Sequence, residues 1–216
     1  MIDPRAFVAA VQPLLEAKDI SGLLALLTHD WDSAQIISLL RTPDCEARKV
    51  AALALSLVGC RECLPALCKV LKDPDPVANQ MAEHAMWSIW FRLGSATANC
   101  ELRKGVEAMN RQEMQQAIKR FSAAIADCDD FAEAWNQRAT AYYLLERYEQ
   151  SILDARQAVA RNPNHFGAWA GLGHCFAHLQ RFDEAIEAYE RSLEINPNLE
   201  CLAEAIAELR GHPRRC

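Results

Sequence analysis

The residues of this sequence whose types and spacing could do chemistry are pairs of cysteines and histidines. Cys60 and Cys63 are separated by two residues, and Cys68 follows. A structural zinc site needs four ligands in tetrahedral geometry, but no second cysteine or histidine pair stands at a matching spacing. Redox chemistry at such a pair would need a strand that leads into a helix, whereas we place this pair in a turn between helices. We therefore interpret these thiols as structural.

His174 and His178 stand four residues apart, so they share one face of a helix and could together bind a metal ion. No glutamate lies between them in the arrangement that zinc proteases use. The sequence contains neither a glycine loop that could cradle a phosphate nor a nucleophile elbow. We therefore interpret both histidines as polar residues of a groove. The chain is predicted not to be an enzyme, with no catalytic residue, metal or cofactor.

Composition indicates a folded, acidic protein. Hydrophobic residues make up 51% of the 216 residues, which is enough for a packed core, and the net charge is −6. The lack of a basic stripe argues against nucleic acid as a ligand. No apolar stretch approaches the ~20 residues of a membrane span, and the start lacks the features of a signal peptide. With nine irregularly spaced cysteines, we expect a cytoplasmic protein with reduced thiols and no membrane partner.

A repeat of 34 residues fills the C-terminal half of the chain. Residues 132–165 and 166–199 align with eight identities, and residues 98–131 fit the same period with Glu101 where the other two units have tryptophan. The identities include an early pair, Trp135 and Trp169, and a late Asn-Pro-Asn triplet at 162–164 and 196–198. This period and these positions resemble the tetratricopeptide repeat. Residues 200–210 resemble the amphipathic helix that caps such arrays.

The resemblance implies a helical hairpin in each unit. Gly173 lacks a Cβ where the second helix approaches, and Tyr189 belongs to the facing stripe of that second helix. Residues 132–165 depart from the family pattern at two positions. Arg138 replaces the usual leucine, and Ala155 replaces the usual aromatic residue.

The N-terminal half has a different period. Residues 44–58 and 75–89 are offset by 31, and each segment follows a proline and opens with an aspartate placed to cap a helix. Asp44 and Arg48, with the alanines and leucines that follow, resemble the short bacterial HEAT repeat. Asn79 departs from that pattern, because it stands where the second unit should have arginine. We expect a degenerate earlier unit in residues 19–42.

These repeats predict an all-α fold, a right-handed α-α superhelix. HEAT-like hairpins (residues 1–94) are expected to continue into three tetratricopeptide hairpins and a cap (residues 95–216). Four bulky side chains crowd the last helix before the boundary: Met86, Trp87, Trp90 and Phe91. We expect them to pack a seam between the two repeat types, because the mismatch needs to be filled. Exposed aromatic residues that mark a partner site are the alternative.

In tetratricopeptide arrays the first helix of each pair lines a concave groove. Carried over to this sequence, the resemblance implies ligand-binding side chains at seven positions: Arg103, Asn136, Gln137, Thr140, Tyr143, His174 and His178. Arrays that grip the acidic carboxyl terminus of a chaperone do so with lysine, arginine and asparagine side chains. The corresponding residues here carry no cation, so that ligand is not expected: Leu102, Val106, Gln137, Gly167 and Gly171.

The resulting hypothesis is a non-catalytic protein–protein interaction scaffold. It would bind a peptide or a helical segment of a partner protein in the groove, mainly through uncharged contacts. An alternative is an accessory subunit or chaperone-like partner of an enzyme, by analogy with phycobilin lyase-like proteins that contain short HEAT repeats. A third hypothesis is weak self-association through an exposed end of the array.

Overall fold

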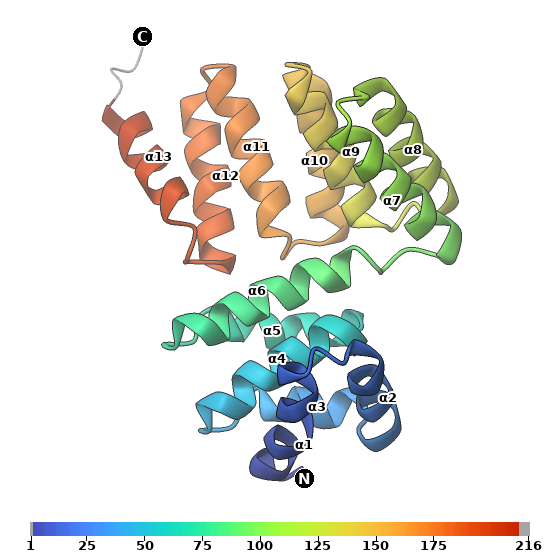
Figure 1. Cartoon of the computed structure of the whole chain (residues 1–216). Helices are drawn as coiled ribbons and strands as arrows, with labels where there is room; N and C mark the ends of the chain where they lie inside the picture. Colours follow the sequence, from blue (N-terminus) through green and yellow to red (C-terminus); the bar gives the residue numbers. More distant parts are fainter. Residues whose placement is uncertain (1, 212–216) are drawn as a thin grey trace. The chain divides into compact units, whose positions relative to one another are not determined.

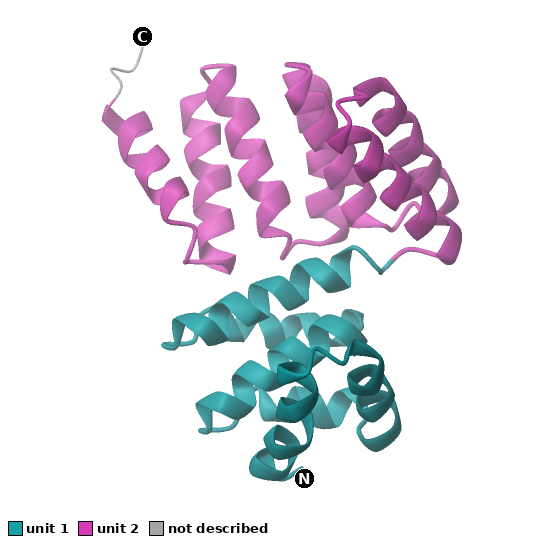
Figure 2. Ribbon diagram, viewed as in Figure 1, with its two compact units in different colours: residues 1–93 teal, residues 94–216 magenta. Residues whose placement is uncertain are grey.

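The computed structural model describes residues 2–211, in which every regular element is a helix. The chain divides into two compact units, Met1–Leu93 and Gly94–Cys216 (Figure 2). None of the helices in the described part of the chain is long and apolar enough to cross a membrane. The all-helical repeat fold predicted from the sequence is confirmed, whereas the handedness of the array and the packed seam stay predictions.

Aspartate side chains begin most helices of the first unit. The helices are α1 (Pro4–Glu16), α2 (Ile20–Asp30), α3 (Ser33–Leu39), α4 (Cys45–Val58), η1 (Arg61–Cys63), α5 (Leu64–Val70) and α6 (Pro76–Trp90) (Figure 1). The carboxylates that accept hydrogen bonds from a first turn are those of Asp3, Asp19, Asp32, Asp44 and Asp75. Each carboxylate satisfies a backbone N–H group that the helix itself leaves without a partner. The predicted caps at Asp44 and Asp75 are confirmed.

A buried ion pair links two loops of the first unit. Arg48 in α4 donates from Nε and Nη2 to the two carboxylate oxygens of Asp73, at 2.6 and 3.0 Å. Its Nη1 donates to the backbone carbonyls of Thr42 and Pro43, at 3.0 and 3.1 Å. Because the two side chains are only 14% and 8% exposed, this bidentate pair is shielded from water. It ties the segment before α4 to the segment before α6.

The second unit consists of three helical hairpins and a final helix. They are α7 (Ala96–Asn110) with α8 (Met114–Asp127), α9 (Ala132–Leu144) with α10 (Tyr148–Arg161), α11 (Phe166–His178) with α12 (Phe182–Ile195), and α13 (Glu200–Gly211) (Figure 1). The helices of the second and third hairpins begin and end at positions 34 residues apart. The period found in the sequence is therefore the period of the structure.

Inside each hairpin the two helices meet at one small residue. A Cβ on Gly105 would lie 2.3 Å from the ring of Phe121, and a Cβ on Gly173 would lie 2.3 Å from the ring of Tyr189. Both rings are buried. Glycine at these positions is therefore what allows a full aromatic ring on the opposite helix. The middle hairpin has buried alanines at both equivalent positions, 139 and 155.

The turn inside each of these hairpins has one residue in the left-handed conformation. These residues are Gln112, Glu146 and Gln180, with φ of 63°, 59° and 59°. None of them is glycine, although a side chain makes this conformation costly. The turns are held by backbone bonds, such as the one from Arg147 N to the carbonyl of Tyr142 at 2.9 Å. In the first unit, Lys18 has the same conformation in the turn between α1 and α2.

Candidate functional site

A groove between α9 and α11, with α10 as its floor, contains a pocket of about 310 Å³. We call it the α9–α11 groove. It is lined by Asn136, Ala139, Thr140, Tyr143, Leu144, Ser151, Ala155, Gly167, Ala170, Gly171 and His174. The α11 wall is almost bare, because three of its four lining residues are glycine or alanine. A Cβ added to Gly171 would meet no atom within 4 Å, so this part of the helix faces open space.

Four of the seven predicted ligand-binding residues line this pocket: Asn136, Thr140, Tyr143 and His174. The other three do not. Arg103 lies exposed on α7 outside the pocket, and the Gln137 side chain donates to Glu133 Oε1 at 2.6 Å. His178 lies next to the pocket, where its Nε2 is 2.9 Å from the Tyr143 hydroxyl. The structure therefore gathers the predicted residues of α9 and α11 except Gln137, and it leaves the α7 residue apart.

Tyrosine and histidine side chains form one end of the groove. Tyr148 stacks on His178, with ring centroids 4.7 Å apart and planes 10° apart. The Tyr189 hydroxyl lies 2.8 Å from His174 Nδ1, so each histidine has a tyrosine partner. Tyr143 stands between them, with its ring centroid 6.3 Å from that of His174 and 5.4 Å from that of His178.

Burial favours the uncharged forms of three side chains at this end of the groove, His174, Tyr143 and Tyr189. The pKa of His174 is lowered by burial and, to a smaller extent, by the nearby His178. Burial raises the pKa of Tyr189 to about 12, and it also raises the pKa of Tyr143. At neutral pH the imidazole of His174 is therefore neutral and both phenols keep their protons. These groups can contribute hydrogen bonds and ring surface to a ligand.

A buried polar network behind the groove was not predicted. His165 Nε2 lies 2.7 Å from Glu133 Oε2, and both side chains are fully buried. His165 Nδ1 accepts from Ala168 N at 3.1 Å, so the ring proton is on Nε2 and is donated to Glu133. The Glu133 carboxylate joins the start of α9 to the start of α11 and so fixes the spacing of the two walls.

The positions of the chaperone-tail clamp contain no cation in the structure either. Leu102 is fully buried in the core and does not line the groove, which corrects its placement by analogy. Gly167 and Gly171 line the pocket without a side chain. An acidic peptide terminus would therefore meet bare helix backbone at the third hairpin.

The described cysteines lie apart from one another or in small groups. Across residues 2–211 no group of three or more histidine, cysteine, aspartate or glutamate side chains is placed to hold a metal ion. The Sγ atoms of Cys60 and Cys63 lie 3.8 Å apart at the start of η1. Burial raises the pKa of Cys63 and that of Cys68 to about 11, so both remain protonated and poorly nucleophilic.

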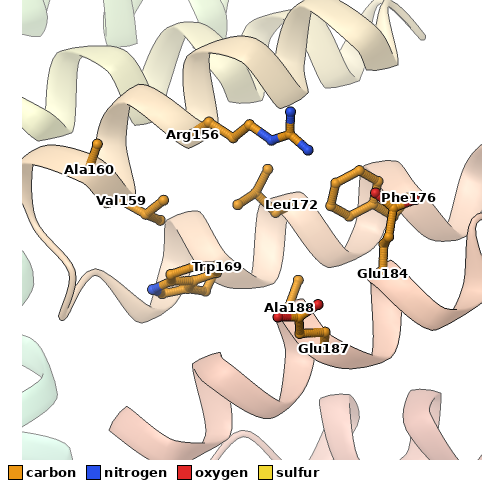
Figure 3. Close-up of a pocket in the computed structure, with 9 residues that line it drawn as sticks. All are labelled: Arg156, Val159, Ala160, Trp169, Leu172, Phe176, Glu184, Glu187 and Ala188. Carbon is orange, nitrogen blue, oxygen red and sulfur yellow. The ribbon is translucent and has the colours of Figure 1, made fainter.

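A second pocket, of about 400 Å³, lies between α10, α11 and α12 (Figure 3). Trp169, Leu172 and Phe176 form its apolar lining. Arg156 extends over one side, while Glu184 and Glu187 project from α12 (Figure 3). The rim thus contains both positive and negative side chains, so it favours neither an anionic nor a cationic ligand.

The preceding hairpin has different side chains at the positions that correspond to this second pocket. One period earlier, Arg138 and Asp154 occupy the positions of Leu172 and Ala188. Arg138 donates to both carboxylate oxygens of Asp154, at 2.6 and 2.8 Å, and its guanidinium lies 5.0 Å from the centre of the Trp135 ring. A buried ion pair thus stands where the later hairpin has two apolar side chains beside a pocket.

Comparison with known proteins places both halves of the chain. A model of HEAT repeats matches residues 33–119, and a model of the tetratricopeptide repeat matches residues 102–156 and 137–200. A TPR repeat-containing protein of Rhizobium etli is 30% identical over 126 residues, which are 58% of this chain and 61% of that protein. The small glutamine-rich tetratricopeptide repeat-containing protein of Dictyostelium discoideum is 33% identical over 54% of this chain and 35% of its own length. The chain spans less than two thirds of either relative.

Solved structures that resemble the chain are tetratricopeptide domains. The first such domain of Spaghetti (RPAP3), bound to the HSP90 peptide SRMEEVD, has a TM-score of 0.53 and 25% identity over 54% of this chain and 92% of its own. The Sgt2 domain of Aspergillus fumigatus has a TM-score of 0.50 and 26% identity over 57% of this chain and 89% of its own. Together, these matches identify the chain as a helical repeat protein in which HEAT repeats are followed by tetratricopeptide repeats.

Proposed function

We propose that the chain is a non-catalytic scaffold that binds a segment of a partner protein in the α9–α11 groove. The observation that carries this proposal is the pocket of about 310 Å³, which gathers Asn136, Thr140, Tyr143 and His174 beside a bare helix wall. Amide and hydroxyl groups can bond to a peptide backbone, while the alanines and glycines accept apolar side chains. The Spaghetti domain that resembles this chain holds a peptide, which supports a peptide ligand for this fold.

The chemistry of the groove favours a ligand that differs from the acidic peptide of the Spaghetti domain. None of the pocket's lining residues is lysine or arginine. An acidic peptide terminus would lose its hydration there without gaining an ion pair. We therefore expect an uncharged segment, and we place the scaffold in the cytoplasm, where thiols such as Cys63 and Cys68 stay reduced.

The experiment uses a phage-displayed library of random peptides, selected on the full chain. Gly171→Leu should abolish binding of the selected peptides, because Gly171 lines the pocket and a Cβ there meets no protein atom within 4 Å, so the new side chain can extend into the space of the ligand. Ala203→Leu is the matched control, since Ala203 lies exposed on α13 and should leave binding unchanged. Equal peptide binding by wild type and Gly171→Leu would place the ligand outside the groove and overturn the proposal.

A further inference from the structure

The three hairpins differ at one pair of facing positions, and this difference shapes the groove. In the first hairpin the ring of Phe121 packs on Gly105, and in the third hairpin the ring of Tyr189 packs on Gly173. In the middle hairpin the residue at the position of these rings is Ala155, which faces Ala139. The middle hairpin thus lacks a ring that its two neighbours contain.

The pocket of the α9–α11 groove lies where that ring is missing. Ala139 and Ala155 both line the pocket. Thr140 also lines it, and Thr140 stands one period before His174, whose Nδ1 meets the hydroxyl of Tyr189 at 2.8 Å. A ring on residue 155 with the direction of Tyr189 would therefore point at Thr140, into the pocket. The pocket of about 310 Å³ therefore adjoins the position that an aromatic side chain on residue 155 would take.

The walls of the pocket suit a flat, uncharged ring. Gly167 and Gly171 expose helix backbone without side chains, so a ring can approach α11 closely. Tyr143 and His174 contribute ring surface at the rim, and edge-to-face contacts between rings add stabilisation beyond the burial of their area. The pocket is near the lower end of the roughly 300–1,000 Å³ typical of ligand pockets. The pocket volume therefore suits one large side chain of a partner better than a larger ligand.

We propose that this pocket binds an aromatic side chain, phenylalanine or tyrosine, from the partner segment, as an intermolecular replacement for the missing ring. The inference rests on the proposed function of the groove and specifies what the groove recognises. A tyrosine gains one further bond. The Thr140 hydroxyl donates to the carbonyl of Asn136 at 3.0 Å, and its oxygen can accept from the phenol of a ligand.

The decisive variant restores the missing ring within the protein. Ala155→Phe alone would overpack the hairpin. In both neighbouring hairpins a Cβ added to the glycine opposite the ring would lie 2.3 Å from the ring, and Ala139 has such a Cβ. Ala139→Gly/Ala155→Phe therefore reproduces the pair found at Gly105 and Phe121. A melting temperature no lower than that of wild type would show that the ring has packed inside the hairpin.

The test starts from peptides selected from the random phage-displayed library on the wild-type chain. We expect the selected peptides to share one phenylalanine or tyrosine. Fluorescence polarisation should show that replacing this residue with leucine weakens binding by about tenfold or more, the scale of an interface hot spot. The protein variant Ala139→Gly/Ala155→Phe should bind the unaltered peptide more weakly than wild type does, by a similar factor. The leucine-containing peptide should bind this variant about as weakly as the unaltered peptide does.

The possible outcomes separate the two proposals. Selected peptides that lack a common aromatic residue, but lose binding to Gly171→Leu, would overturn the aromatic inference and leave the peptide groove intact. Peptides that bind Ala139→Gly/Ala155→Phe as tightly as wild type would also overturn the inference. Peptides that ignore Gly171→Leu would overturn the proposed function itself.

Discussion

The two units of this protein fix their helices by different chemistry. In the first unit, aspartates cap five helices, and the Arg48–Asp73 pair ties two loops together. In the second unit, helices meet through complementary size, with glycine opposite a ring at Gly105 and Gly173. Side-chain caps begin the helices of the first unit, whereas the second unit adds the fit of a ring against glycine to its own buried polar pairs, Glu133–His165 and Arg138–Asp154.

This difference decides where each unit can vary. A polar tie fails when either partner is removed, because the remaining charge stays buried. A shape-based contact can change if both residues change together, as Ala139 and Ala155 have done relative to their neighbours. The binding pocket we propose lies in the unit that uses shape.

The largest expected effect comes from removing the polar tie. Arg48→Met leaves Asp73 buried without its bidentate partner, and we expect unfolding of the first unit to become about 3 kcal/mol easier. Native-state hydrogen exchange of the α4 amides measures this change within the intact chain. Arg191→Met is the control, because its pair with Glu194 is more than half exposed and is worth less than about 1 kcal/mol. Equal effects of the two substitutions would contradict the role of burial in the Arg48–Asp73 pair.

Smaller changes in stability are expected when two glycines on α11 are replaced by alanine, and the two changes should have opposite signs. Gly173→Ala places a Cβ 2.3 Å from the buried Tyr189 ring and should destabilise the second unit by about 1–3 kcal/mol. Gly171→Ala meets no atom and should stabilise α11 by about 0.5–1 kcal/mol, because alanine favours helices. Urea unfolding followed by exchange of the α11 amides compares them. A loss of stability in both variants would show that Gly171 is packed.

The left-handed turn residues provide a still smaller test. Glu146→Gly removes the Cβ that opposes a φ of 59°. We expect a gain of about 0.5–1 kcal/mol, reduced by the extra freedom of glycine in the unfolded chain. Thermal unfolding of the full chain measures this gain. Glu149→Gly, inside α10, serves as the comparison and should cost about 1 kcal/mol. Stability changes of the same sign would contradict the role of backbone conformation in these turns.

The smallest change is expected in the pH dependence of the first unit. Arg48, with a further bond from Asp75 N, lowers the pKa of Asp73 below its usual 3.8. A lowered folded-state pKa gives stability that is present above the unfolded value and is lost as pH falls through the folded value. The free energy of opening of the α4 amides, obtained from exchange rates after division by the intrinsic rate at each pH, should therefore change little between pH 7 and pH 5 and decrease below pH 4. In Arg48→Met the pKa of Asp73 is no longer lowered by the guanidinium. The loss of stability below pH 4 should therefore be smaller than in wild type.

Much of the fold could be predicted from the sequence, because its signals are local. The 34-residue period, the capping aspartates and the glycines at helix contacts each need only neighbouring residues to be recognised. The candidate site could be predicted only in part. Analogy of position brought together Asn136, Thr140, Tyr143 and His174, which line one pocket, whereas it assigned Arg103 to the same groove and Arg103 lies on α7 outside the pocket.

The rest depends on contacts between residues far apart in the chain. Glu133 and His165 are 32 residues apart, and nothing in the sequence pairs a surface position with a histidine between two helices. The absence of a ring at Ala155 was visible as a departure from the family pattern. Its result, a pocket shared by α9, α10 and α11, needed the positions of three helices.

The bare helix backbone at Gly171 has a consequence for how this protein could evolve. A Cβ there meets no packed atom, so the stability threshold that eliminates most mutations imposes little selection against a side chain that extends from this position into the pocket. Related chains could therefore explore serine, aspartate or arginine at Gly171, and acquire partners of new chemistry, before any compensating change elsewhere in the fold.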